Sequence, residues 1–160
     1  MKKATDNLYS EMNRVLLEGA KGLVKDFKSP GDLLLDLIRA QDKIHTHVRD
    51  AKLDHTKDHY YFLVLISQDI LYPWLKKDKD YITIIARGIK GLHSYQGFEG
   101  CQGSVQAILQ AYGHDDGGLE SSEQVMYDIE WFLKLSKIVA VVEEYEKLDD
   151  IRRQQEKVEA

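Results

Sequence analysis

Apolar residues recur at steps of three and four along most of the chain, which is the pattern of amphipathic helices. The first helix is predicted over 5–27. Ser29 and Pro30 then suit the cap and the first position of a second helix, which is predicted over 30–53. The pattern therefore divides the first third of the chain into two long helices.

A third helix is predicted over 56–72, and it is apolar on all sides between Tyr60 and Ile66. A helix of this kind is usually central, so we expect it in the middle of the fold. Pro73 should end it, because the residue before a proline disfavours the helical conformation. Whether the second and third helices are continuous around 54–56 stays open.

A fourth helix is predicted over 81–95 and a fifth over 101–112, with a loop at 96–100. The β-branched run YITII at 81–85 also suits a strand. We favour the helix, because no partner strand is found elsewhere in the sequence. Gly113 suits the C-terminal end of the fifth helix.

The last helix is predicted over 121–156, because Ser121 and Gln124 have capping-box spacing and no Gly or Pro follows. At about 1.5 Å per residue it would be roughly 54 Å long, so it must project, bend or pack against another copy. The sequence thus predicts one all-α domain over 1–160. We expect a bundle of about six helices, roughly antiparallel where connected, with 149–160 as an exposed helix end or frayed tail.

The composition is that of a globular protein, with 43% hydrophobic and 31% charged residues and a formal net charge of −5. The charge is uneven along the chain. Residues 1–90 hold 16 Lys and Arg against 13 Asp and Glu, whereas 91–133 hold no Lys or Arg against seven acids. Since a phosphate backbone is bound by Lys and Arg, we expect no nucleic-acid binding except through 1–90.

The single cysteine, Cys101, excludes an internal disulfide framework. The longest apolar run, Tyr60 to Ile66, is far shorter than the ~20 residues of a spanning helix, so we expect no membrane segment. No signal sequence is recognised at the start of the chain. These features favour a cytoplasmic protein.

Four histidines lie close together at His45, His47, His55 and His59, with aspartates among them. The i, i+4 spacing of His55 and His59 places both rings on one helix face, as in zinc sites. One hypothesis is therefore a divalent metal such as zinc, held by His47, His55 and His59. The alternative is a polar helix end that faces water.

The glycine-rich segment 97–103 leads into the fifth predicted helix. Three interpretations stay open: small residues that let helices pack closely, a ligand-binding loop formed by Gly100, Cys101 and Gly103, or a nucleophilic Cys101 at a helix N-terminus. The acidic surroundings should oppose formation of the thiolate.

An aromatic corner at the end of the third helix contains Tyr72 and Trp74. Such side chains suit partner interfaces, and they equally suit the domain's own core.

No complete catalytic constellation can be assembled from these residues, so we do not expect an enzyme. The leading hypothesis is a non-catalytic protein-interaction module: a small cytoplasmic subunit, adaptor or inhibitor that binds a protein partner or associates with itself. One alternative is a metal-binding helical protein or metal-dependent hydrolase that uses the His45–His59 cluster. Another is a small-ligand sensor with a pocket near 97–103.

Overall fold

The computed structural model describes residues 2–27, 30–39, 55–113 and 122–159. The described elements, in chain order, are α1 (Lys2–Lys25), a helix at 30–39, α3 (His55–Ile66), the π-helical turn η1 (Ser67–Leu71), α4 (Tyr72–Lys76), α5 (Tyr81–Gly113) and α6 (Ser122–Glu159). The prediction of an all-α fold is confirmed over these ranges, where no strand occurs and the run at 81–85 is helical.

Because α3, η1 and α4 follow one another without a break, the described residues form five continuous helices and not the six that the pattern predicts. The fourth and fifth predicted helices belong to one element, α5, which bends at Gly97 but does not stop there. The predicted loop at 96–100 is therefore a kink. The question of continuity around 54–56 lies partly outside the described residues, since α3 begins at His55.

The prediction that Pro73 ends the third helix is wrong. Tyr72 keeps helical dihedral angles (φ −63°, ψ −48°), and the chain stays helical until Lys77, whose φ is 52°. A proline ring in an α-helix normally meets the carbonyl group four residues earlier. Here that carbonyl lies in the π-helical turn η1, whose extra residue changes the local geometry, and we attribute the uninterrupted helix to this turn.

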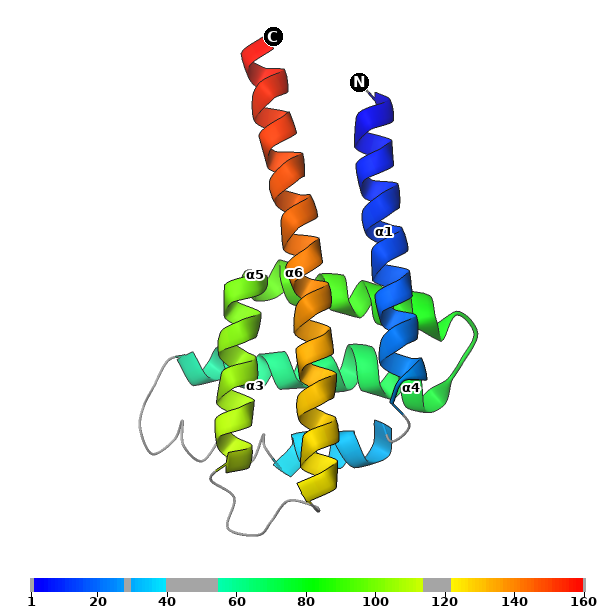
Figure 1. Cartoon of the computed structure of the whole chain (residues 1–160), viewed down its shortest axis with the longest axis vertical. Helices are drawn as coiled ribbons and strands as arrows, with labels where there is room; N and C mark the ends of the chain where they lie inside the picture. Colours follow the sequence, from blue (N-terminus) through cyan, green and yellow to red (C-terminus); the bar gives the residue numbers. More distant parts are fainter. Residues whose placement is uncertain (1, 28–29, 40–54, 114–121, 160) are drawn as a thin grey trace.

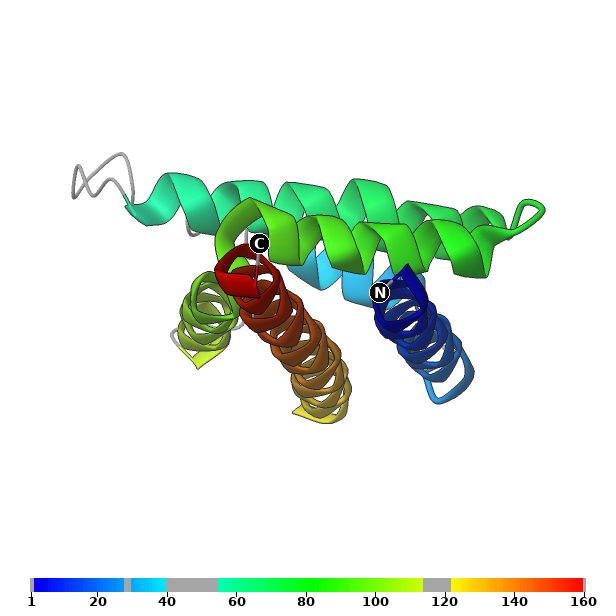
Figure 2. The same cartoon turned by 90° about the horizontal axis from the view of Figure 1, so that it is seen from above.

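The helices form two layers that cross each other (Figures 1 and 2). α3 and the first half of α5 lie side by side and antiparallel, as predicted for helices joined by a short loop. α1, α6 and the second half of α5 run across this pair (Figure 1). The expected simple bundle of antiparallel helices is therefore corrected to a layer of two helices, crossed on one side by α1, α6 and the second half of α5 (Figure 1).

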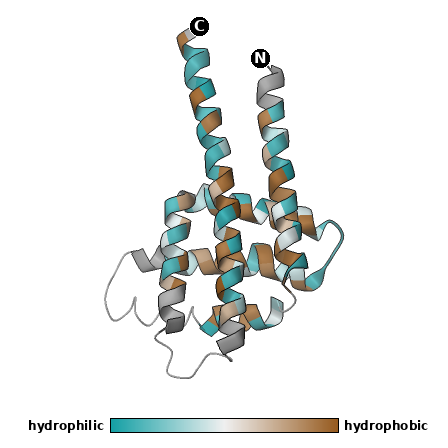
Figure 3. Ribbon diagram, in the orientation of Figure 1, coloured by the Kyte–Doolittle hydropathy of each residue, from teal (hydrophilic) through white to brown (hydrophobic). Residues whose placement is uncertain are grey.

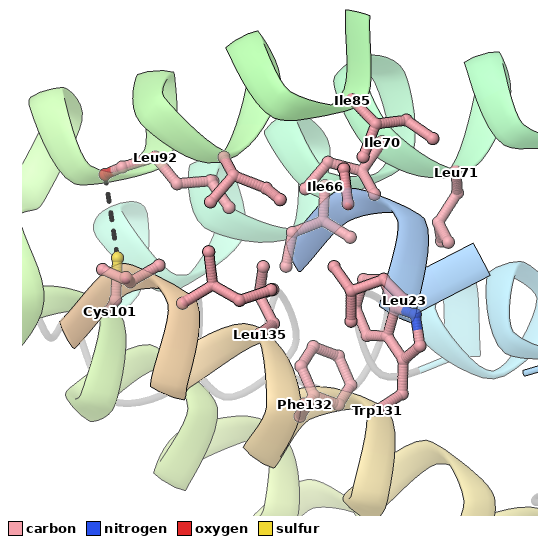
Figure 4. Close-up of a cluster of buried hydrophobic side chains, with 14 of the residues drawn as sticks. Leu23, Ile66, Ile70, Leu71, Ile85, Leu92, Cys101, Trp131, Phe132 and Leu135 are labelled. Atoms are coloured by element: carbon pink, nitrogen blue, oxygen red, sulfur yellow. Dashed lines mark hydrogen bonds between the residues drawn. The ribbon is translucent and has the colours of Figure 1, made fainter. Parts of the chain in front are cut away.

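The core lies where the two layers meet (Figure 4). Leu23 from α1, Ile66 from α3, and Trp131 and Phe132 from α6 are each at most 1% exposed. The buried centre of α6 lies where its sequence is most apolar, between 125 and 142. α3 differs from the prediction, because only its inner side is buried and it forms part of an outer layer.

α6 has 38 residues, about 57 Å at ~1.5 Å per residue, and it projects past the α3–α5 layer beside α1 (Figure 1). Its projecting turns are mostly hydrophilic (Figure 3). Asp149 is 3% exposed there, where it accepts hydrogen bonds from Tyr9 of α1 and from Arg152. The segment 149–159 is thus helical, and at Asp149 it is held against α1. None of the described helices combines the length and apolar character that crossing a membrane requires.

α5 approaches the π-helical turn η1 closely at Gly88. A Cβ atom built on Gly88 would lie 2.8 Å from the backbone oxygen of Asp69, which is closer than real Cβ contacts. The same construction on Gly91, one turn further on, meets nothing within 4 Å. Only the first of these glycines is therefore required by packing.

We expect Gly88→Ala to destabilise the protein by about 1–3 kcal/mol, because the backbone at Asp69 must move to admit a methyl group. Gly91→Ala is the matched control and should raise stability by up to about 1 kcal/mol, since alanine favours the helix and its Cβ enters open space. Chemical denaturation of both variants measures the two effects. Equal stability of the two variants would contradict the close approach.

Candidate functional site

The residues that the sequence singles out for chemistry gather around the kink in α5. Gly97 has φ 70°, a conformation that glycine adopts at little cost. Beyond it the helix turns so sharply that a Cβ built on Gly100 would lie 2.7 Å from the Cβ of Gln96. The kink therefore brings the start of the second half-helix onto the last turn of the first.

A serine and a histidine form a polar pair behind this kink. Ser104 Oγ lies 2.9 Å from Nδ1 of His59 on α3, and it accepts a hydrogen bond of 3.0 Å from Gln96 Nε2. Since Oγ already accepts from Gln96, its own proton can be donated to His59 Nδ1. This is the geometry of an activated hydroxyl, but Ser104 is 0% exposed and offers no access to a substrate.

Cys101 lies inside the core and not at an exposed helix start. It is 2% exposed, and its Sγ donates to the backbone oxygen of Leu92 at 3.7 Å (Figure 4). Burial raises the pKa of the thiol to about 11, against a lowering by the hydrogen bond with Gln96 and with a lesser rise from the charge of Glu143. The thiol is therefore protonated at neutral pH, which does not support a nucleophilic role.

Glu143 of α6 joins the two halves of α5. Its carboxylate accepts a hydrogen bond from Nε2 of His93, before the kink, and another from the backbone N–H of Phe98, after it. The bond to His93 is the main reason that the pKa of Glu143 lies below its ordinary value of 4.5. The Phe98 N–H lies at the start of the second half-helix, where a negative charge is favoured by the helix dipole.

These contacts act within the protein. Ser104 and Cys101 are sealed in the core, while His59, Gln96 and Glu143 bond to groups on neighbouring helix segments. The arrangement fixes the angle of the kink and joins α3 and α6 to α5. In this fold it presents neither the serine nor the cysteine to a ligand.

Of the three predicted histidine ligands, the structure describes the side chain of His59 only. His47 lies outside the described residues, and His55 begins α3 with a side chain that is not described. His59 is turned toward Ser104. Among the described residues, no three His, Cys, Asp or Glu side chains form a group suited to a metal ion. The metal site therefore stays a prediction.

The predicted ligand-binding loop is part of the kink. Gly100 lies against Gln96, and a Cβ on Gly103 would be 4.0 Å from Cε1 of His59, so both glycines are in contact with other helix segments. Of the open interpretations of this segment, close helix packing fits the described geometry best.

The aromatic corner is divided between the core and the surface. Trp74 is 3% exposed and packs in the core. Of the two interpretations of the aromatic corner, packing on the protein's own core therefore fits Trp74. Tyr72 is 54% exposed and faces solvent, with the ammonium group of Lys76 5.3 Å from the centre of its ring. Only Tyr72 is placed where a partner could reach it.

Tyr72 belongs to a larger surface on the side of the α3–α5 layer away from α1 and α6, which we call the outer face. No described helix lies on that side (Figure 2). At helical spacing, α3 to α4 contribute Tyr61, Leu65, Gln68 and Tyr72. α5 contributes Ile84, Arg87, Gly91 and Tyr95. The outer face thus consists of one ridge from each of two antiparallel helices.

Large apolar side chains are exposed along both ridges. The exposed fractions are 51% for Tyr61, 40% for Ile84 and 44% for Tyr95. The ring of Tyr61 packs edge-on against Tyr95 at 6.3 Å between centroids and against Tyr60 at 6.1 Å. The tyrosines thus form one contiguous aromatic group that spans the two helices.

The sequence interpretation missed most of these residues. Gln96, Ser104 and Glu143 are separated along the chain, and only the kink brings them together. One feature of the sequence could have indicated the outer face, since the run from Tyr60 to Ile66 is apolar on every side of its helix. That run predicts burial on all sides, whereas the described fold covers one side only.

No protein-family model matches the chain, and neither does any curated protein or any solved structure compared with it.

We expect Glu143→Gln to lower the free energy of unfolding at neutral pH by about 1 kcal/mol, because the amide loses the charge-assisted bonds to His93 and Phe98. A carboxyl group whose pKa is lowered by folding stabilises the protein above its unfolded pKa. That stability is lost as pH falls through the folded pKa. The difference between wild type and variant should therefore shrink from about pH 6 to about pH 3, as measured by denaturation.

Glu144→Gln is the matched control, since Glu144 is an exposed neighbour on the same helix. It should follow the wild-type pH dependence. A Glu143→Gln variant as stable as the control at neutral pH would show that Glu143 does not support the kink.

Proposed function

We propose that this protein is a non-catalytic protein-interaction module that binds a partner through the outer face of its α3–α5 layer. The observation that carries the proposal is that an unusually apolar helix is packed on one side only. Phe62, Leu63 and Ile66 are at most 1% exposed on its inner side, while Tyr61 and Tyr72 are each more than half exposed on the outer side.

The energetics of this surface favour docking. Tyrosine provides a large apolar body and one polar tip, and for these reasons it is enriched where proteins meet. Burying one side chain of this size contributes about 1.5–3 kcal/mol. Because Tyr61, Tyr72 and Tyr95 are each already about half buried, a partner that covers all three would gain roughly 2–5 kcal/mol before the costs of association.

The positions of the reactive groups support a non-catalytic role. Ser104 and Cys101 are buried, and their neighbours bond to one another across the kink. The same bonds make the α3–α5 layer a rigid platform, because they fix α5 to α3 and α6. A rigid platform loses little entropy when a partner binds.

The proposal can be tested by photo-cross-linking in cells of the native host. A photoreactive amino acid replaces Tyr61 in one variant and Tyr72 in a second. In the control variant it replaces Asn13, which is exposed on α1. We expect one discrete protein adduct from positions 61 and 72 and none from position 13. The identified partner should then bind the purified chain, and Tyr61→Ala combined with Tyr95→Ala should weaken that binding at least tenfold without unfolding the protein.

Two results would contradict the proposal. One is the absence of an adduct from both outer-face positions. The other is an adduct whose purified protein binds wild type and the double tyrosine variant equally well.

A further inference from the structure

We infer that the partner segment that docks on the outer face is an amphipathic helix whose apolar stripe is flanked by Asp or Glu side chains. This inference rests on the proposed function, since it specifies what the outer face binds. It follows from three features of the surface: its charge, its backbone and the open position at Gly91.

The described parts of the two helices hold few carboxylates beside their cations. The segments 59–76 and 81–98 contain one carboxylate, Asp69, against Lys76, Arg87 and Lys90, and Lys76 pairs at 3.9 Å with Asp78 in the turn between the helices. Asp69 is half-buried and lies at the close approach to Gly88. Arg87 is exposed on the outer face and forms no ion pair with any carboxylate of the described residues. A carboxylate on a partner that covers this face would therefore pair with Arg87.

The same charges disfavour a second copy of this chain. A twofold dimer brings the same patch of each copy together, so cationic residues meet cationic residues. Around Arg87 the outer face offers no carboxylate to separate them. Like charges placed together at an interface cost several kcal/mol, which argues against self-association through this surface.

The backbone of the layer favours a helical partner. In both helices that form the outer face, the backbone N–H and C=O groups are bonded within the helix, so an extended peptide finds no strand edge to join. A helix satisfies its own backbone bonds and can pack on the outer face through its side chains alone.

Gly91 marks where the partner's apolar stripe would sit. It is exposed one turn before Tyr95, and the space that a side chain would occupy there is open. Arg87 lies one turn before Gly91 on the same ridge, so a partner side chain seated over Gly91 has a cation beside it. An apolar residue flanked by carboxylates matches this pair of positions.

Two synthetic, stapled helical peptides test the inference directly. They share one leucine stripe and differ only in the flanking positions, which are Glu in one peptide and Lys in the other. Nuclear magnetic resonance titration of the full chain reads out the tyrosine side-chain signals, and it is repeated with single-stranded oligothymidine. We expect the Glu peptide to perturb Tyr61 and Tyr95 and to bind at least tenfold more tightly than the Lys peptide at low salt.

Three variants refine the test. Arg87→Glu should reverse the preference between the peptides, and Arg87→Lys, which keeps the charge, should retain it. Gly91→Phe should weaken binding of the Glu peptide at least tenfold while the thermal unfolding midpoint stays close to that of wild type, because the ring occupies open space.

Equal binding of the two peptides at the outer face would overturn the acidic partner and leave the proposed docking function standing. Perturbation of the tyrosines by oligothymidine alone would also overturn it, in favour of a nucleic acid. Concentration-dependent shifts of the same signals without peptide would show that a second copy covers the face.

Discussion

The bend at Gly97 is the constraint on which the rest of the structure depends. A straight helix of 33 residues could not lie antiparallel to α3 and also run beside α6, because the two layers cross. The positive φ of Gly97 lets one element do both. The polar contacts of His93, Phe98 and Glu143 then hold the bend, and Cys101 and Ser104 pack into the space behind it. Residues of catalytic type thus serve to join the two layers.

The crossing also determines which surfaces are covered. α1 and α6 pack on one side of the α3–α5 layer, and the apolar side chains of that side form the core (Figure 2). On the other side of the layer, α3, α4 and α5 expose tyrosines and Arg87. This asymmetry is the physical basis of the proposed interaction role, since a solvent-exposed aromatic group of this extent is stabilised when a partner removes it from water.

The sequence predicts the helices well and their arrangement poorly. The spacing of apolar residues locates α1 and α6 to within a few residues, and the buried centre of α6 at Trp131 follows from the same pattern. Periodicity gives no information on which neighbour covers each side, so the exposed side of α3 was missed. The glycines around Gly97 were likewise expected to form a loop between two helices. A glycine-rich segment occurs both where a helix bends and where it ends, so the sequence alone does not distinguish the two. The pairing of His93 with Glu143 spans 50 residues and depends on that bend.

Hydroxyl-radical footprinting of the purified chain tests the central claim, that the outer face is uncovered in the isolated protein. Tyr61, Tyr72 and Tyr95, with exposed fractions of 51%, 54% and 44%, should be oxidised far faster than Trp74, which is 3% exposed and should be strongly protected. Protection of the three tyrosines at concentrations where the chain is monomeric would contradict the account, because the protein would then cover this surface itself.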